Sequence, residues 1–201
     1  MTAGTIGALV VRASNGRRAI LGNCHVLAAE GRAPLETPIF QPGPPDRPAD
    51  PQTLLGTLVR FQPLVPLPGT NQVDCAIAEI DDAVGGSPDI PQIGRPTRID
   101  KANPAHEVEK FGRTTEFTIG RIISTNADIT MLFETGDFRF TEQVLIESVD
   151  AQPFSSQGDS GALVVDRVTG AAVALVMAGS AGHTFANPLS AVAQALGVEL
   201  G

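Results

Sequence analysis

Short apolar runs, each ended by glycine or proline, are the feature that most constrains the fold of this chain. The 201 residues include 21 Gly and 16 Pro, and long stretches with helical periodicity are nearly absent. Runs such as "GALVV" (7–11) and "GALVVDRVTGAAVALVMAG" (161–179) are rich in the apolar residues typical of strands. Asn-Gly at 15–16 and Thr-Gly at 169–170 predict hairpin turns. We therefore expect a mainly β protein.

The C-terminal segment is the exception to this pattern. In "NPLSAVAQAL" (187–196), Asn187 suits a helix N-cap and Pro188 suits the first helical position. The apolar residues that follow recur at i, i+3, i+4 and i+7, which is one face of a helix: Leu189, Val192, Ala193 and Leu196. These signals predict a C-terminal α-helix.

Two proline-rich stretches interrupt the strands. The segment 41–52 has five prolines and predicts an exposed loop, because proline lacks the N–H that a sheet interior needs. The segment 85–105 has four prolines and little periodicity, which suggests a connection between two lobes. We expect an N-terminal lobe over 1–95 and a C-terminal lobe with its helix over 96–201.

Composition excludes several classes of protein. The net charge is −8, and the chain has no basic stripe with which to bind nucleic acid. No apolar run is long enough to span a membrane, and the N-terminal residues do not resemble a signal peptide. Two cysteines, Cys24 and Cys75, are too few for a secreted disulfide framework. We expect a cytoplasmic protein with free thiols, although a bond between these two cysteines stays open.

Three residues in separate motifs predict nucleophilic catalysis. His25 stands at a strand end in "LGNCHVLA", Asp74 in an apolar strand in "VDCAIAEI", and Ser160 in "QGDSGALVV". A serine nucleophile needs a base, and the base needs an orienting acid. Each residue also has a structural interpretation: a turn serine, a strand-end histidine, and a buried acid that caps backbone N–H groups. The three motifs together favour catalysis, and their His–Asp–Ser order differs from that of the α/β-hydrolases.

With these motifs the sequence resembles the trypsin-like, chymotrypsin-fold serine peptidases over nearly its whole length. More narrowly, "FGRTTEFTIGRI" (111–122), "FSSQGDSGALVVD" (154–166) and "MAGSAGHTFANPLSAV" (177–192) resemble bacterial intracellular trypsin-like peptidases related to the protease domain of the plant Narrow Leaf protein. The resemblance implies two six-stranded β-barrels, with the active site between them.

The resemblance also implies the role of each residue. His25 acts as general base and then acid, Asp74 holds its tautomer, and Ser160 attacks the scissile carbonyl. The backbone N–H groups of Gly158 and Ser160 form the oxyanion hole. Asp159, which pairs with a new N-terminal ammonium in secreted relatives, is expected to find another partner here without zymogen cleavage.

The specificity pocket that the resemblance implies differs from that of trypsin. Phe154 stands where trypsin has an acid, which argues against Arg or Lys at the residue before the cleaved bond, P1. The strand with Met177, Ala178 and Gly179 forms the pocket wall. His183 lies where some glutamate- or glutamine-cleaving relatives have a pocket histidine, although a structural role is the better interpretation. Acidic, amide and apolar P1 residues all stay open.

The sequence therefore predicts a serine endopeptidase that acts on proteins or peptides through an acyl-enzyme. The alternative is a protease-like domain, catalytically idle or self-processing, that serves as a binding or scaffold module. We expect no cofactor and no metal site, since the histidines are scattered and lack ligand spacing. An activating or adjacent domain partner stays open.

Overall fold

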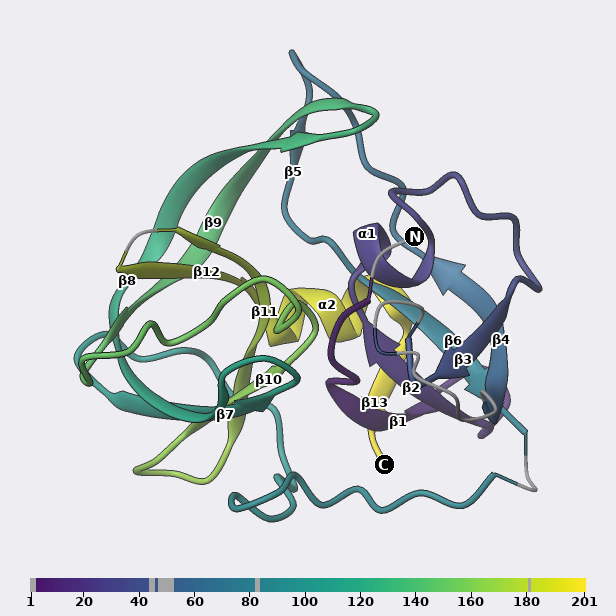
Figure 1. The fold of residues 1–201 in the computed structure, drawn as a ribbon, viewed down its shortest axis with the longest axis horizontal. Helices are drawn as coiled ribbons and strands as arrows, with labels where there is room; N and C mark the ends of the chain where they lie inside the picture. Colours follow the sequence, from purple (N-terminus) through teal and green to yellow (C-terminus); the bar gives the residue numbers. More distant parts are fainter. Residues whose placement is uncertain (1–2, 44–45, 47–52, 82–83, 181) are drawn as a thin grey trace.

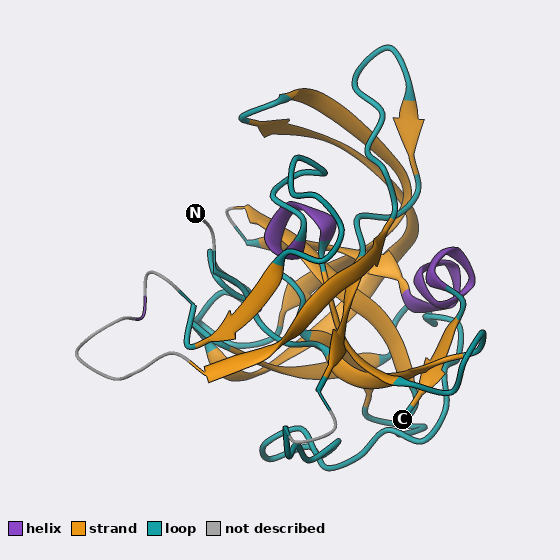
Figure 2. Ribbon diagram, turned by 90° about the vertical axis from the view of Figure 1, so that its right-hand side faces the viewer, coloured by secondary structure: helices purple, strands orange, loops and turns teal. Residues whose placement is uncertain are grey.

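The computed structural model describes residues 3–43, 46, 53–81, 84–180 and 182–201. Most of the expected loop over 41–52 lies outside the described residues. Strands dominate the described part of the chain, as Figure 2 shows. Its two helices are short, and neither is long and apolar enough to cross a membrane.

The N-terminal sheet has six antiparallel strands in the order β13-β1-β2-β6-β4-β3. Their bounds are β1 (Ala8–Arg12), β2 (Arg18–Gly22), β3 (Pro38–Gln41), β4 (Thr53–Phe61), β6 (Ala76–Ile80) and β13 (Val198–Leu200). Gly16, at a φ of +71°, lies in the turn between β1 and β2, where a positive φ favours glycine. The hairpin predicted from Asn-Gly is confirmed.

The C-terminal sheet closes into a barrel, because β12 pairs with both β11 and β9. Its strands are β5 (Thr70–Asn71), β7 (Glu107–Gly112), β8 (Glu116–Phe133), β9 (Gly136–Ser148), β10 (Leu163–Asp166), β11 (Ala172–Ser180) and β12 (His183–Pro188). Gly170, at a φ of +67°, turns the chain between β10 and β11, as the Thr-Gly signal predicts.

Each half of the chain contributes a strand to the other sheet. β5 comes from the N-terminal half and pairs in parallel with β9. β13 belongs to the N-terminal sheet through β1, although it lies in the range expected for the second lobe. The connection over 85–105 runs along the lower edge of Figure 1. The two lobes are therefore tied together at more than this connection.

The C-terminal helix α2 (Leu189–Leu196) lies between the two sheets (Figure 1). Its buried residues Leu189, Val192 and Leu196 join a core cluster with side chains from both sheets. Burying each of them contributes roughly 1.5–3 kcal/mol. The predicted apolar helix face is confirmed and holds the lobes together.

The β8–β9 hairpin is longer than the sequence patterns indicated. It spans 116–148 and rises from the barrel toward the top of Figure 1, beside β5. Three register shifts interrupt its ladder, between Ile122 and Ile129. Its outer half alternates half-buried and exposed residues and contains no long apolar run. For that reason the sequence pattern marked only its two ends, over 106–125 and 143–148.

Candidate active site

His25 and Asp74 meet between β2 and β6. Gly22 ends β2, and the single turn of helix α1 (Cys24–Leu27) follows, which places His25 at the mouth of the sheet. The imidazole Nδ1 is paired with Oδ2 of Asp74, and the backbone N–H of His25 donates to Oδ1 at 3.0 Å. Asp74 is fully buried. The carboxylate therefore fixes the ring at Nδ1 and directs Nε2 away from it.

This environment raises the pKa of His25 above its usual value of 6.5. Burial alone lowers that pKa, because it disfavours the charged ring. The Asp74 carboxylate outweighs burial through its charge and its hydrogen bond, and the charge of Glu30 adds to the same effect. Asp74 and Glu30 thus stabilise the protonated form of the His25 ring.

Two buried asparagines hold the backbone of Asp74. Asn23 Nδ2 donates to the Asp74 carbonyl at 2.7 Å, and the Asp74 N–H donates to Asn187 Oδ1 at 3.0 Å. Asn187 Nδ2 also donates to the Asp74 carbonyl, at 3.2 Å. The prediction that Asn187 caps α2 is wrong: the N-cap is Pro188, without a side-chain cap. The Asn-Pro pair before an apolar run resembles a cap locally, and nothing in it points to a partner 113 residues away.

The serine loop packs against the segment that precedes β1. The Thr5 N–H donates to the Ser160 carbonyl at 2.8 Å, and the Thr5 hydroxyl donates to the Gly158 carbonyl at 3.0 Å. A Cβ on Gly4 would lie 2.7 Å from the Ser160 carbonyl oxygen and 3.0 Å from the side chain of Val26. Ser160 and the residue after His25 thus approach the same glycine. The Ser160 hydroxyl donates to the Met177 carbonyl at 3.1 Å.

Gly158 occupies a position that only glycine fits. Its φ is +103°, and a Cβ there would lie 2.4 Å from both Arg113 Nη1 and Thr114 Oγ1. Among the described residues, the backbone N–H groups of Gly158 and Ser160 donate to no protein acceptor. The loop therefore keeps two backbone N–H donors, separated by one residue, available to a ligand.

Asp159, between these two donors, is fully buried and accepts several hydrogen bonds. Its carboxylate accepts from the backbone N–H groups of Thr114 at 2.7 Å, Ser156 at 2.8 Å and Thr115 at 3.2 Å. The Thr115 hydroxyl donates to it at 2.7 Å. Lys110 Nζ lies 3.9 Å away and supplies the opposite charge. Asp159 thus has partners other than an N-terminal ammonium.

Lys110 is as buried as the carboxylate it faces. Its ammonium donates to the Glu116 carbonyl at 2.9 Å and to the Thr115 hydroxyl, and it lies 5.7 Å from the centre of the Phe154 ring. Burial lowers the pKa of Lys110 to about 8, against the opposing effect of the Asp159 charge. One sequence signal could have revealed it: Lys110 falls on the inward-facing alternation of β7, between Val108 and Gly112.

The residues expected to line the specificity pocket lie in different surroundings. Met177 is buried in an apolar cluster with Phe138 and Phe140, whereas Ala178 is only half-buried. The Phe154 ring packs in the core of the C-terminal barrel. His183 is exposed at the start of β12.

Gly179, in the expected pocket wall, lies close to the backbone of Ser155, the residue after Phe154. A Cβ on Gly179 would lie 2.9 Å from the Ser155 carbonyl oxygen. The Ser155 hydroxyl is itself hydrogen-bonded to that of Thr184, at 2.7 Å. A side chain at position 179 would therefore collide with the Ser155 backbone.

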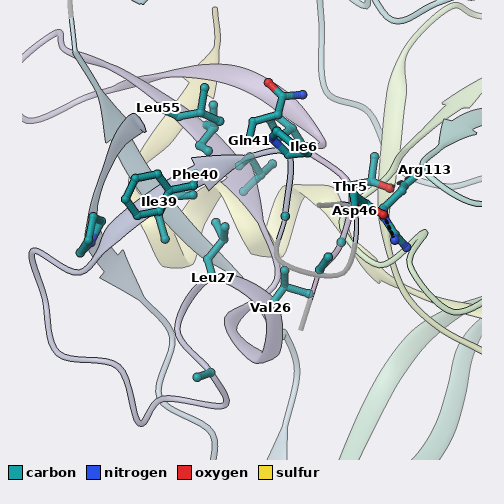
Figure 3. A pocket seen from close by; sticks show the side chains of 18 of the residues that line it. Thr5, Ile6, Val26, Leu27, Ile39, Phe40, Gln41, Asp46, Leu55 and Arg113 are labelled. Carbon is teal, nitrogen blue, oxygen red and sulfur yellow. Dashed lines mark hydrogen bonds and ion pairs between the residues drawn. The ribbon is translucent and has the colours of Figure 1, made fainter. Parts of the chain in front are cut away.

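A cavity of about 720 Å³ lies beside α1 (Figure 3). Its lining includes the segment 3–6 and residues of α1, β3 and β4, with apolar side chains such as those of Leu27, Ile39 and Leu55. Arg113 and Asp46 form an ion pair at one end. The cavity adjoins the serine loop, because the segment 3–6 borders both.

The two cysteines lie next to the histidine and aspartate of the candidate site. Cys24 and Cys75 flank His25 and Asp74, and both are buried and free, so the expectation of free thiols is confirmed. Within the described residues, no group of three or more His, Cys, Asp or Glu side chains is arranged to hold a metal ion.

Comparison with known proteins places this architecture in a known class. No protein-family model and no curated protein matches the chain. Solved structures do match. Thermobifida fusca protease A is 20% identical, with a TM-score of 0.66, and the match covers 98% of this chain and 90% of that one. Nocardiopsis protease is 16% identical, with a TM-score of 0.67 and coverage of 99% and 97%.

A third match is a glutamic acid-specific serine protease that is described as using a histidine triad in substrate binding. It is 17% identical, with a TM-score of 0.66 and coverage of 98% of both chains. At these identities the likeness shows the fold. The chain has the chymotrypsin-like fold of two β-barrels with a C-terminal α-helix, as predicted.

Proposed function

We propose that the protein is a serine endopeptidase that cleaves peptide bonds through Ser160, His25 and Asp74. The observation that carries the proposal is the buried carboxylate–imidazole pair, next to a serine loop with two unused N–H donors. The chymotrypsin-like fold, shared with structures of serine proteases, supports the same reaction class. The narrower relation to the Narrow Leaf group is also a proposal, supported by the motifs at 111–122, 154–166 and 177–192.

The proposed mechanism follows from the positions of these groups. The Ser160 hydroxyl leaves the Met177 carbonyl, transfers its proton to His25 Nε2 and attacks the substrate carbonyl carbon. Asp74 stabilises the imidazolium that forms, and the N–H groups of Gly158 and Ser160 stabilise the oxyanion. His25 then protonates the leaving amine as the C–N bond breaks. Water, deprotonated by His25, hydrolyses the resulting acyl-enzyme.

The proposed substrate contacts are the strand edge at Met177, Ala178 and Gly179, with Phe154 beneath and His183 at the rim. Of the three histidines in the chain, His25 belongs to the triad and His106 Nδ1 is bonded to Asp166 at 2.8 Å. A preference for glutamate at P1 would therefore rest on His183 alone.

Intact-mass spectrometry after exposure to diisopropyl fluorophosphate tests the function directly. We expect one diisopropylphosphoryl adduct on the wild type and none on Ser160→Ala, because only an activated serine is modified. Far-UV circular dichroism should be the same for both. No adduct on the wild type would reject the proposal and favour the idle binding module.

The same mass spectra test self-processing. A domain that cleaves only itself would yield a shortened wild-type chain and an intact Ser160→Ala chain. An intact wild type that forms the adduct and cleaves a peptide library supports the endopeptidase.

The pH profile should show the raised pKa of His25. Only the neutral imidazole accepts the serine proton, so kcat/KM should fall as the pH drops through a value above 6.5. Initial rates at constant ionic strength between pH 5 and 9 would locate this limb. A limb at or below 6.5 would contradict the effect assigned to Asp74 and Glu30.

A further inference from the structure

The loop after the histidine helix has an unusual backbone. Ala29 and Glu30 have φ values of +47° and +62°, and Gly31 follows at +86°. Non-glycine residues in the left-handed region are strained and need surrounding contacts to hold them. This conformation turns the side chain of Glu30 toward the β8–β9 hairpin.

Glu30 binds the tip of that hairpin through both carboxylate oxygens. Phe133 pairs with Gly136, so Glu134 and Thr135 make up the entire turn. Oε1 of Glu30 accepts from the Glu134 N–H at 3.3 Å, and Oε2 accepts from the Thr135 N–H at 3.0 Å. Both bonds are charge-assisted. The Glu30 side chain is only 9% exposed, and its Oε2 also lies 3.9 Å from Arg32 Nη2.

The residue before this turn lies on the catalytic imidazole. The Phe133 ring stacks on His25 with 5.3 Å between centroids and 25° between planes. Behind it, the Phe133 ring packs against Phe138 at 5.6 Å and Phe140 at 6.5 Å, and both of these are buried. The hairpin tip thus brings a supported aromatic surface to one face of the ring.

We propose that Glu30 is a positioning residue that fastens the hairpin tip to the histidine loop, so that Phe133 orients the imidazole of His25. The proposal rests on the proposed function, because orienting this ring matters only if His25 is the base. Asp74 fixes the imidazole in its plane at Nδ1, and Phe133 restricts tilting out of that plane.

The charged groups around the imidazole are few. Asp74 faces Nδ1 and Glu30 lies on the loop that follows the helix. Glu134, at the hairpin tip, accepts from Arg32 of the loop that follows the helix, with 2.9 Å between Oε2 and Nη2. Both of these side chains are largely exposed. Such exposed pairs contribute little. Apart from Asp74, Glu30 is therefore the group whose removal should change the pKa of His25.

The test compares Glu30→Gln with Glu36→Gln. Glu36 lies in the same segment, is exposed and has a similar φ of +70°, so the control loses the same charge from the same backbone conformation. We expect Glu30→Gln to lower kcat/KM by about 10- to 100-fold, since small misplacements of catalytic groups have effects of this size. Its acid limb should move to lower pH. Glu36→Gln should match the wild type in both respects.

Hydrogen exchange provides a readout that does not need turnover. The amides of Glu134 and Thr135 should be protected in the wild type and in Glu36→Gln, and should lose protection in Glu30→Gln. Lost protection together with lower kcat/KM supports the proposal. Unprotected wild-type amides, or full activity in Glu30→Gln, overturns it. If the amides are protected but the wild type forms no fluorophosphonate adduct, the proposed function fails, and with it the catalytic role of the intact contact.

Discussion

Asp74→Asn is expected to lower kcat/KM by about four orders of magnitude without unfolding the protein. The structure gives a specific reason. The His25 backbone N–H donates to Oδ1 of Asp74, so an asparagine would place its carbonyl oxygen there. Its NH₂ group would then face Nδ1 and force the proton of the imidazole onto Nε2. In that tautomer the ring cannot accept the serine proton.

The chain offers a matched control in its second histidine–carboxylate pair. His106 Nδ1 is bonded to Asp166 Oδ2 at 2.8 Å, at the end of β10. Asp166→Asn makes the same chemical change outside the proposed site, so kcat/KM should stay at the wild-type value. Steady-state kinetics on a peptide substrate, at a temperature where both variants are folded, makes the comparison. A loss of less than tenfold in Asp74→Asn would contradict its proposed role.

The fold could be predicted because its main signals are local. A turn such as Asn15-Gly16 depends on which residues tolerate positive φ, and this choice is visible in two letters of sequence. The helix face at Leu189, Val192 and Leu196 is likewise a pattern within eight residues. The His, Asp and Ser motifs, in this order, indicated the chymotrypsin-like class of fold, and the observed fold agrees with it.

The supports of the candidate site could not be predicted, because they join distant parts of the chain. Glu30 and Thr135 are 105 residues apart, and Asn187 and Asp74 are 113 apart. Nothing near Glu30 indicates a hairpin partner, since the tip of β8–β9 carries no long apolar run. Which polar side chains meet depends on how the two lobes pack, and a single sequence does not encode this packing in any short pattern.

Asp159 combines a feature that could be predicted from the sequence with a partner that could not. The resemblance to secreted peptidases, in which this residue is paired, predicts a partner for Asp159, and an unpaired buried charge would be costly. The identity of that partner, Lys110, depends on the pairing of β7 with β10 and β8, which the turn signals do not specify.

Lys110→Met is expected to destabilise the protein by about 3–5 kcal/mol, because it leaves the charge of the Asp159 carboxylate in the interior without an opposite charge. Methionine keeps most of the shape of the lysine stem, so the loss reports charge more than packing. We also expect slow fluorophosphonate labelling of Ser160, because Asp159 anchors the loop that carries Gly158 and Ser160. Urea unfolding followed by circular dichroism measures the free energy of unfolding. The rate of fluorophosphonate labelling shows whether the loop still holds Ser160 in a reactive position.

The double variant Lys110→Met with Asp159→Asn separates charge from shape. Its interior has no charge on either side, so it should recover part of the stability lost in Lys110→Met. The recovery should be incomplete, because the amide NH₂ introduced by Asp159→Asn would face a backbone N–H that now donates to the carboxylate. Equal stabilities of Lys110→Met and the wild type would show that Asp159 does not depend on this ammonium.

Burial lowers the pKa of Lys110 from its usual value of 10.5 to about 8. Between these two pH values the unfolded chain keeps a proton that the folded chain has released, so this group should make the wild type more stable as the pH rises. Urea unfolding of the wild type and of Lys110→Met across this range checks the sign, because the variant should lack this rise.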